Sequence, residues 1–259
     1  MKQDRLSALM ARLSIVRTLS LAEAMELLDV SESTARRMFA QLEQSGAAIR
    51  THGGIRASDQ VPTVYSFEYG AKMNIKNKVA IAKHACNFLE DGDVVFCDSG
   101  TTIQCFCAEL IHKIQKEKLN ITVYTNSLAN LELLSPYLTV NLVGGRYRAN
   151  RKDFCGFMAD QALTGIYFTK SFVGADGCVG GKIFTTTDFD TMRMNEIAME
   201  NSRQTYMLVD SSKFSVSSHV AYAPVDKIHT VITDDCITKE AYNQLKKSNV
   251  RVVLAEINE

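Results

Sequence analysis

The chain has 259 residues, of which 46% are apolar and 22% charged, enough for ordinary globular cores in a large domain and a small one. Lys plus Arg and Asp plus Glu both number 29, so the neutral balance argues against a protein that coats nucleic acid over its whole surface. A local basic patch is still compatible with this balance, because DNA binding needs only a few well-placed phosphate contacts.

No apolar run approaches the roughly 18 residues that a membrane-spanning helix needs, and the charged N-terminus lacks the apolar core of a signal peptide. The seven cysteines are odd in number and include no Cys-x-x-Cys pair. This pattern favours reduced thiols over disulfides or a zinc site. We therefore expect a cytoplasmic protein with no membrane association, metal or cofactor.

The first 57 residues predict three short helices and a hairpin. Apolar residues at helical spacing indicate the first helix, over about 6–13. Ser20 and Glu23 form a capping box that starts a second helix, which runs to about Leu28. A third helix is expected from a Ser31 cap to about Ser45, with Gly46 as its stop signal, and residues 47–56 follow as a hairpin whose turn uses Gly53 and Gly54.

The third helix has two different faces at 100° per residue. One face is apolar and must pack on the other helices; it consists of Ala35, Met38, Phe39 and Leu42. The other face carries short polar and cationic groups near the helix start, as docking in a DNA major groove requires. From Arg36 to Arg56 there are four arginines and one acidic residue, Glu43. We predict DNA contacts by Ser31, Ser33, Thr34, Arg36, Arg37, Gln41, Arg50, His52, Gly53, Gly54 and Arg56.

Residues 58–77 contain Pro62, Gly70 and scattered aromatics without a clear period, and are interpreted as a linker. From residue 78 to 259, apolar strand-like runs alternate with helical patterns, which indicates an α/β domain with a largely parallel sheet. The predicted strands cover 94–97, 121–124, 140–143, 171–174, 206–209, 230–232 and 250–254.

Polar or glycine-rich segments follow five of these runs. Asp98-Ser99-Gly100-Thr101-Thr102 opens a helix, where backbone amides and hydroxyls suit a phosphate. No Gly-Lys-Ser/Thr follows, so this is not a nucleotide-binding P-loop. Carboxyl ends of parallel strands meet at one edge of a sheet, where such folds bind ligands. The predicted effector contacts are Asp98, Ser99, Gly100, Thr101, Thr102, Thr125, Asn126, Ser127, Gly144, Gly145, Asp176, Arg193 and Lys213.

The residues Val30 to Arg37, Leu42 to Gly46 and Arg50 to Gly54 resemble the DeoR family pattern V-S-x-x-T-I-R-R-D-L, L-E-x-x-G and R-x-H-G-G. The five strand-end segments resemble the same family's D-S-G-T-T, T-N-S, G-G, G-x-D-G and D-x-S-K-F, in order, so the resemblance spans about 6–234. It implies a winged helix-turn-helix joined to an α/β sensor similar to sugar-phosphate isomerases. It also implies a double-stranded operator, a phosphorylated sugar effector, a homo-oligomer (dimer or tetramer) and a repressor rather than an enzyme.

Two positions depart from the family pattern. Met38 stands where an Asp usually follows the paired arginines. After Thr185 and Thr186 the family has a Glu and then a Lys; here Asp190 and Asn195 stand near those places, and Arg193 is the nearby cation. The alternative function is a sugar-phosphate isomerase or deaminase with an accessory N-terminal domain, which would need an acid or histidine partner for Asp176.

Overall fold

The computed structural model describes residues 2–44, 48–57 and 65–257. The chain divides into two compact units, Met1–Met73 and Asn74–Glu259, each of which is described by itself. The boundary lies within the segment 58–77 that the sequence predicts as a linker. Residues 58–64 of that segment lie outside the described residues.

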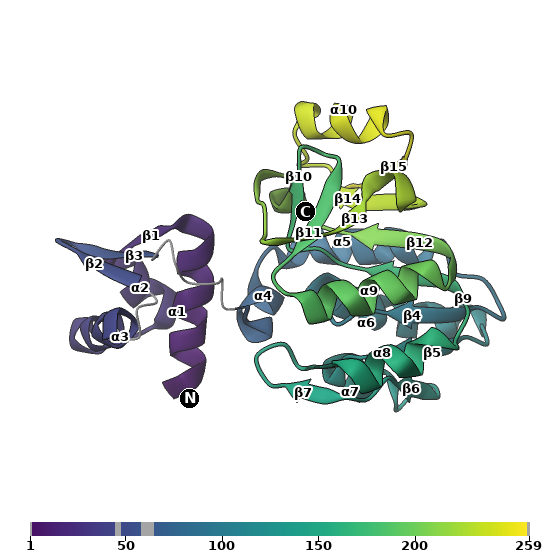
Figure 1. Cartoon of the computed structure of the whole chain (residues 1–259), viewed down its shortest axis with the longest axis horizontal. Helices are drawn as coiled ribbons and strands as arrows, with labels where there is room; N and C mark the ends of the chain where they lie inside the picture. Colours follow the sequence, from purple (N-terminus) through teal and green to yellow (C-terminus); the bar gives the residue numbers. More distant parts are fainter. Residues whose placement is uncertain (1, 45–47, 58–64, 258–259) are drawn as a thin grey trace. The chain divides into compact units, whose positions relative to one another are not determined.

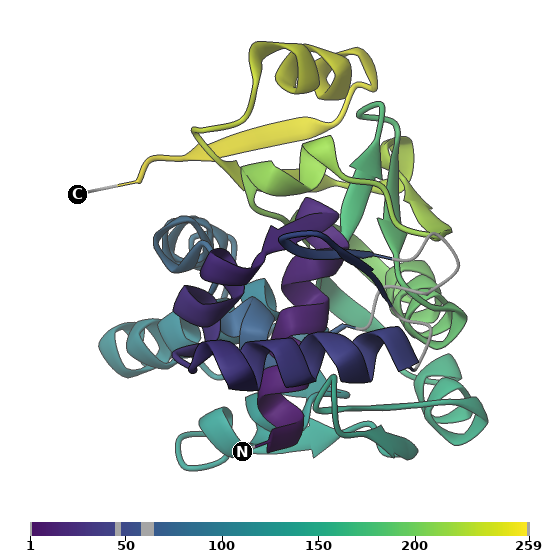
Figure 2. The same cartoon turned by 90° about the vertical axis from the view of Figure 1, so that its left-hand side faces the viewer.

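The N-terminal unit is a winged helix (Figures 1 and 2). Its helices are α1 (Lys2–Val16), α2 (Leu21–Leu28) and α3 (Glu32–Gln44). Its antiparallel sheet has the order β1-β3-β2, made of β1 (Thr18–Ser20), β2 (Ala48–Thr51) and β3 (Gly54–Ala57). The three predicted helices and the hairpin are confirmed, β1 was not predicted, and the expected helix end at 45–46 lies outside the described part of the chain.

The capping box explains the sharp start of α2. Glu23 N donates to Ser20 Oγ at 3.2 Å, and Ser20 N donates to Glu23 Oε2 at 2.8 Å. These bonds satisfy amides that a helix start otherwise leaves without partners. Asp29, with φ 48°, ends the helix in the left-handed region. The apolar faces of the three helices then meet in one core with the sheet, which includes Leu9, Leu13, Phe39, Leu42 and Ile55.

Residues 65–77 are more regular than the sequence predicts. Ser66 caps a short helix, α4 (Phe67–Lys72), by accepting from Tyr69 N at 3.3 Å. Phe67 and Tyr69 are buried, and α4 belongs to the N-terminal unit. The expectation of an irregular linker is therefore wrong over these residues. A six-residue helix with an internal glycine is too short to show a period, and burial of its aromatic residues stabilises it instead.

The C-terminal unit is built on a parallel sheet of seven strands in the order β15-β14-β12-β9-β4-β5-β6 (Figure 1). All seven predicted strands are confirmed, with shifts at their ends. Their bounds are β4 (Val94–Cys97), β5 (Thr122–Thr125), β6 (Val140–Leu142), β9 (Phe168–Val173), β12 (Ser202–Leu208), β14 (Thr230–Asp234) and β15 (Arg251–Ala255). The chain adds strands outward from β4 in one direction and then outward from β9 in the other. The topological switch point therefore lies between β4 and β9.

Helices cover both faces of this sheet. Side chains of consecutive strand residues point to opposite faces and pack in two separate hydrophobic cores. Val95 and Phe172 pack in the core under α5 (Ile75–Cys86), α6 (Thr101–Glu117) and α7 (Leu128–Leu134). Phe96 and Val173 pack in the core under α8 (Phe157–Thr164), α9 (Phe189–Glu200) and α10 (Lys239–Lys247). This two-sided burial is why the strands appear in the sequence as continuous apolar runs.

Short strands that the sequence does not predict follow the carboxyl ends of the parallel strands. β7 (Arg146–Arg148) pairs with β8 (Asp153–Cys155). A second antiparallel sheet joins β10 (Gly177–Val179), β11 (Ile183–Thr186) and β13 (Val220–Pro224). The 3-10 helices η1 (Ser211–Ser215) and η2 (Val225–Lys227) complete the unit. Among the described residues, no helix combines the length and apolar character needed to cross a bilayer.

The opposite edge of the sheet, where the strands begin, is locked by a buried ion pair. Lys170 of β9 is 4% exposed, and its Nζ donates to both carboxylate oxygens of Asp93 at 2.8 and 2.7 Å. Glu90 Oε2 accepts a further bond from Lys170 at 3.0 Å. These contacts tie the middle of the sheet to the loop between α5 and β4.

Candidate functional site

The face of α3 that is predicted to contact DNA is exposed. Ser31, Ser33, Arg36, Arg37 and Gln41 are exposed, and Thr34 is half-buried. The hydroxyl of Ser31 lies 3.1 Å from those of both Ser33 and Thr34. Small hydroxyl groups and two guanidinium groups thus stand together at the start of the helix, where side chains reach base edges in a major groove.

Met38 stands where the family pattern has an Asp, and it lies in the core of the N-terminal unit, on the face opposite the arginines. Arg36 pairs with Glu32 one turn earlier, at 2.8 Å between exposed side chains. Arg37 stands next to this pair and is also exposed.

The hairpin β2–β3 presents Arg50, His52 and Arg56 as exposed side chains. Glu43 Oε1 accepts from Arg50 N at 3.3 Å and ties the end of α3 to the wing. The two glycines do not take the left-handed conformation that the turn prediction implies. Gly54 is required for a different reason, because a Cβ there would lie 2.1 Å from the Leu19 carbonyl oxygen on β1.

In the C-terminal unit, the loops after β4 and β9 meet across the switch point. Asp98 Oδ2 accepts from Gly174 N at 3.1 Å, and Asp98 Oδ1 accepts from Ser99 N at 2.6 Å. Burial raises the pKa of the Asp98 carboxyl above its usual range, while these two amides lower it. Asp98 is 4% exposed. Through the two hydrogen bonds, its carboxylate joins the end of β4 to the end of β9.

The residues after Asp98 form the start of a long helix. α6 has 17 residues and begins at Thr101, and its N-cap residue Gly100 supplies no side-chain hydrogen bond to the first turn. Thr101 and Thr102 are largely buried beside it. The first-turn amides and the positive end of the helix dipole are suited to an anion. We call the loops after β4, β5, β9 and β12 the strand-end site.

The segment after β5 is buried and used internally. Thr125 Oγ1 donates to Cys97 O at 2.6 Å, Asn126 Nδ2 donates to Phe154 O at 3.1 Å, and Ser127 Oγ accepts from Asn130 N at 3.2 Å. Their exposed fractions are between 0 and 2%. In this arrangement the three side chains hold the loop in place and do not present groups to solvent.

The remaining predicted residues divide between the site and its surroundings. Gly144 is exposed, and Gly145 is packed so closely that a Cβ would lie 2.6 Å from Cys155 O. Asp176 Oδ2 accepts from Thr186 Oγ1 and Thr187 N, both at 3.1 Å. Lys213 lies in η1, directly after β12, and is half-buried.

Arg193 is not brought to the strand-end site. Its side chain is 53% exposed on the outer side of α9, 3.9 Å from Glu196. Asn195 takes the inward position, at 1% exposure. Burial raises the pKa of both Asp98 and Tyr222, and the Asn195 amide interacts with these two groups and lowers both pKa values. The expectation that Arg193 supplies the missing cation is therefore wrong in this geometry.

A network of arginines and carboxylates beside the site was missed from the sequence. Arg148 donates from Nε to Asp153 Oδ1 at 2.8 Å and from Nη2 to Asp153 Oδ2 at 2.7 Å. Its Nη1 also donates to Asp188 Oδ1 at 2.7 Å. Arg151 lies 3.0 Å from Asp188 Oδ2 and 3.6 Å from Asp176 Oδ2. The only signal in the sequence is a cluster of arginines after Gly145, which also fits a solvated loop.

A second missed residue is a buried lysine on α5. Lys78 is 4% exposed. Burial lowers its pKa to about 8; the nearby Asp210 carboxylate acts against this change, and the Lys213 ammonium adds to it. Cys105 of α6 also lies close enough to influence Lys78. Two lysines and the beginning of α6 therefore gather on one side of the strand-end site.

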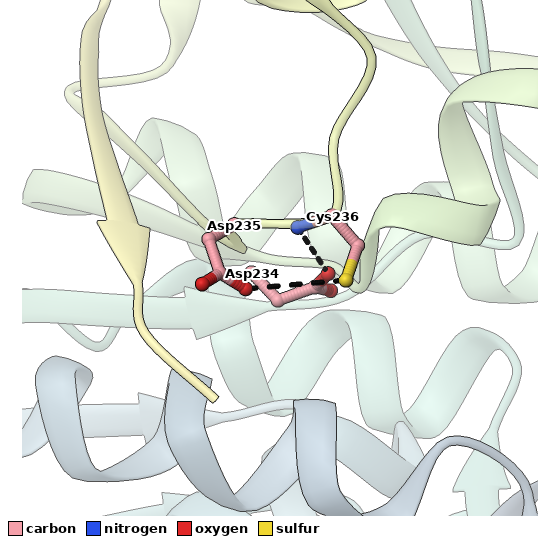
Figure 3. Close-up of side chains that lie close together, drawn as sticks. All are labelled: Asp234, Asp235 and Cys236. Carbon is pink, nitrogen blue, oxygen red and sulfur yellow. Dashed lines mark hydrogen bonds between the residues drawn. The ribbon is translucent and has the colours of Figure 1, made fainter. Parts of the chain in front are cut away.

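Asp234, the last residue of β14, and the next two residues, Asp235 and Cys236, place three potential metal ligands within 4.8 Å of one another (Figure 3). Asp234 is fully buried, but its Oδ2 accepts from Ser211 N at 2.7 Å and its Oδ1 from Cys236 N at 3.1 Å. Both oxygens therefore already accept hydrogen bonds from the protein, Oδ1 within the turn and Oδ2 from the loop after β12. Asp235 and Cys236 are exposed neighbours in this turn, and nothing else at this position points to an ion.

Comparison with known proteins identifies both units. Residues 5–61 match the model of the DeoR-like helix-turn-helix domain, and residues 73–235 match the DeoR C terminal sensor domain. The lactose phosphotransferase system repressor of Lactococcus lactis subsp. lactis is 34% identical, over 92% of this chain and 93% of that protein. The HTH-type transcriptional regulator IolR of Bacillus subtilis (strain 168) is 30% identical, over 92% and 93%.

Among solved structures, ribose 5-phosphate isomerase A of Methanocaldococcus jannaschii is 22% identical and covers 53% of each chain with a TM-score of 0.41. A match of this size is too weak to support a conclusion about activity. The two family models and the full-length relatives carry the assignment, and they agree with the winged helix and the α/β unit described above. The chain belongs to the DeoR family of transcription regulators.

Proposed function

We propose that this protein is a repressor whose winged helix binds an operator and whose C-terminal unit releases it when a phosphorylated sugar occupies the strand-end site. One observation carries the proposal: the start of α6, without a side-chain cap, lies at the switch point of the sheet on the side where Lys78 and Lys213 gather. Ligands of open α/β sheets bind at this place. Helix amides and ammonium groups together suit a phosphate group.

The DNA-binding part of the proposal rests on the exposed polar face of α3 and the arginines of the wing. A homo-oligomer, dimer or tetramer, would present two copies of α3 to two half-sites about one helical turn apart. The name of the Lactococcus relative, a lactose phosphotransferase system repressor, supports a role in carbohydrate metabolism, and the name of the Bacillus relative supports transcription regulation. Phosphorylated sugars are the natural effectors for a site that binds both a phosphate and hydroxyl groups.

A role in binding accounts for the strand-end site better than isomerase or deaminase catalysis does. A general base must reach the proton that it removes. Asp176 Oδ2 already accepts from Thr186 and Thr187, and Arg151 lies 3.6 Å away. Asp98 is buried between two strand ends. Asp176 Oδ2 and both oxygens of Asp98 therefore accept hydrogen bonds from the protein itself, which favours a role in shaping the site over removal of a substrate proton.

A thermal-shift screen of the full-length protein tests the ligand. The panel contains glucose 6-phosphate, fructose 6-phosphate, galactose 6-phosphate, the parent sugars and inorganic phosphate. A ligand at about 100 times its Kd adds roughly 2.7 kcal/mol of stability. Stabilisation by a phosphorylated sugar but not by its parent supports the proposal. Equal stabilisation by parent and phosphorylated sugar contradicts the phosphate site.

The operator is tested separately, by selecting duplexes from a random pool with the wild-type protein. We expect an enriched inverted repeat, and a loss of affinity for it of at least about tenfold in Arg37→Ala, in line with one lost base contact. Ligand stabilisation should be unchanged in this variant. Equal operator affinity in Arg37→Ala would remove α3 as the recognition helix.

A further inference from the structure

Asn74 is the first residue of the C-terminal unit, directly after Met73 of the N-terminal unit. It stands at the N-cap position of α5 with φ 50°, a left-handed conformation that asparagine tolerates better than most residues. Its side chain does not cap α5. Instead, Nδ2 donates to Asp210 Oδ1 at 3.0 Å and to Ser212 Oγ at 3.3 Å. The junction between the units is thereby joined to the loop that carries Lys213.

Asp210 Oδ1 collects several donors in this loop. It accepts from Asn74 Nδ2 at 3.0 Å, from Ser212 N at 3.1 Å and from Ser212 Oγ. Asp210 is 2% exposed, and Lys78 and Lys213 both lie nearby. The carboxylate therefore holds, inside the protein, donors of the kind that an anionic oxygen of a ligand requires.

A ligand anion that enters beside Lys78 and Lys213 meets the Asp210 carboxylate. The two negative charges repel each other, and they compete for the same lysines and hydrogen-bond donors. The arrangement with Asn74 bound to Asp210 and Ser212 is thus suited to the ligand-free state. A ligand that shifts this loop must weaken the contact at the junction.

We propose that Asn74 is a positioning residue: its contact with Asp210 and Ser212 stabilises the ligand-free arrangement, and binding of a phosphate-bearing effector breaks that contact at the junction between the units. This inference rests on the proposed function of the strand-end site. It adds the element through which occupation of the site reaches the DNA-binding unit. The effector acts only through the difference in its affinity for the two arrangements.

Removal of the Asn74 amide should strengthen effector binding. If part of the binding energy is used to break the Asn74 contact, removing the amide lowers that cost. A hydrogen bond to a charged group corresponds to about a tenfold change in an equilibrium constant, so Asn74→Gly should bind the effector about tenfold more tightly. A residue that only keeps the site in shape would, when removed, weaken binding.

The test uses full-length Asn74→Gly, because glycine keeps the left-handed backbone while it removes the amide. Asn249→Gly is the matched control: Asn249 also has a positive φ, 55°, and its exposed side chain precedes β15 at the opposite edge of the sheet. Asn74→Asp is a second variant, which places a carboxylate against Asp210 and should open the same contact. Thermal unfolding establishes that each variant is folded.

Titration calorimetry with glucose 6-phosphate, fructose 6-phosphate, galactose 6-phosphate and inorganic phosphate gives the first readout. We expect about tenfold tighter binding in Asn74→Gly, tighter binding in Asn74→Asp and wild-type binding in Asn249→Gly. Equal or weaker binding in both Asn74 variants overturns it. If no probe binds the wild type, the proposed function has failed for this panel, and the second readout decides the inference alone.

Hydrogen exchange over residues 70–80 is that second readout. Without ligand, Asn74→Gly should exchange faster here than the wild type and Asn249→Gly, because the start of α5 has lost its tie to the loop after β12. Where a probe binds, the ligand-bound wild type should approach the exchange of ligand-free Asn74→Gly. Unchanged exchange in Asn74→Gly overturns the inference whether or not a ligand has been found.

Discussion

Arg148 grips Asp153 with two parallel hydrogen bonds, Nε to Oδ1 at 2.8 Å and Nη2 to Oδ2 at 2.7 Å, and the Asp153 side chain has no exposed surface. Arg148→Met would keep much of the volume and leave a buried carboxylate without its cation. Removing one partner of a buried pair costs about 3–5 kcal/mol. We expect a loss of this size in the unfolding free energy of the C-terminal unit, measured by urea denaturation.

Arg146→Met is the control for this substitution. Arg146 pairs with Asp190, but its side chain is 67% exposed. Exposed pairs contribute about 0–1 kcal/mol, so this variant should remain within about 1 kcal/mol of the wild type. Equal losses in the two variants would mean that burial does not set the strength of the Arg148–Asp153 pair.

Gly54→Ala should disable the winged helix. The added Cβ would meet the Leu19 carbonyl oxygen at 2.1 Å, so β1 and β3 must separate. We expect a loss of about 3 kcal/mol or more in the N-terminal unit, and no operator binding, while ligand binding persists. Gly53→Ala has no heavy atom within 4 Å of its new Cβ, so the N-terminal unit should keep its wild-type stability. Thermal unfolding distinguishes the two variants, and electrophoretic mobility shifts with the selected duplex show the loss of operator binding in Gly54→Ala.

Lys213→Ala should give a repressor that binds its operator but is not released. Loss of a charge-assisted contact weakens phosphate binding by roughly tenfold or more. Lys227→Ala is the control, because Lys227 is an exposed lysine in η2, just before β14 begins at the opposite edge of the sheet. The measurement is the effector concentration that releases the selected duplex. Release of Lys213→Ala at the wild-type concentration would exclude Lys213 from the site.

Effector binding should weaken above pH 8 through Lys78. Burial lowers the pKa of this lysine to about 8, against the opposing effect of Asp210 and with the help of Lys213. A phosphate monoester is already doubly ionised in this range, so deprotonation of Lys78 is the change that an anion would feel. Affinity should fall by about tenfold between pH 7 and 9 in the wild type and stay flat in Lys78→Met. Calorimetry at the two pH values is the measurement.

The contribution of Lys78 to the free energy of unfolding should increase as the pH rises above 8, whereas effector affinity should decrease. The ordinary pKa of 10.5 lies above the folded value of about 8. Between these two values the unfolded chain binds more protons at Lys78 than the folded protein does. The contribution of Lys78 to the unfolding free energy therefore rises with pH in this window. Denaturation of the wild type and Lys78→Met at pH 8 and 10 isolates this contribution. If the unfolding free energy of the wild type, relative to that of Lys78→Met, fell between pH 8 and 10, the lowered pKa would be contradicted.

Much of the fold could be predicted because strong local signals agree with the final packing. Val94–Cys97 appears as an apolar run since both its faces are covered, and Ser20 and Glu23 form the capping box that their spacing predicts. The missed elements have weaker signals. Strands such as β7 and β10 have three residues each, too few for a period, and depend on partners that only the folded chain supplies.

The position of the candidate site could be predicted from the sequence, but most of its side-chain contacts could not. Asp98 and Gly174 do meet, since parallel strands end at one edge. Which side chains face solvent depends on helix phase and on distant partners. Arg193 and Asn195 are two positions apart, about 200° around α9, and their contrasting exposure follows from that rotation. Arg148 finds Asp188 across a separation of 40 residues, which no local pattern encodes.

The buried Lys170–Asp93 pair fixes the edge of the sheet where strands begin, remote from every loop of the strand-end site. Mutations in the loops after β4, β9 and β12 therefore act on a foundation that does not depend on them. Substitutions in these loops should therefore alter ligand preference without disturbing the Lys170–Asp93 pair. The C-terminal unit is therefore suited as a scaffold for biosensors, in which the loops of the strand-end site are varied and the Lys170–Asp93 pair is retained.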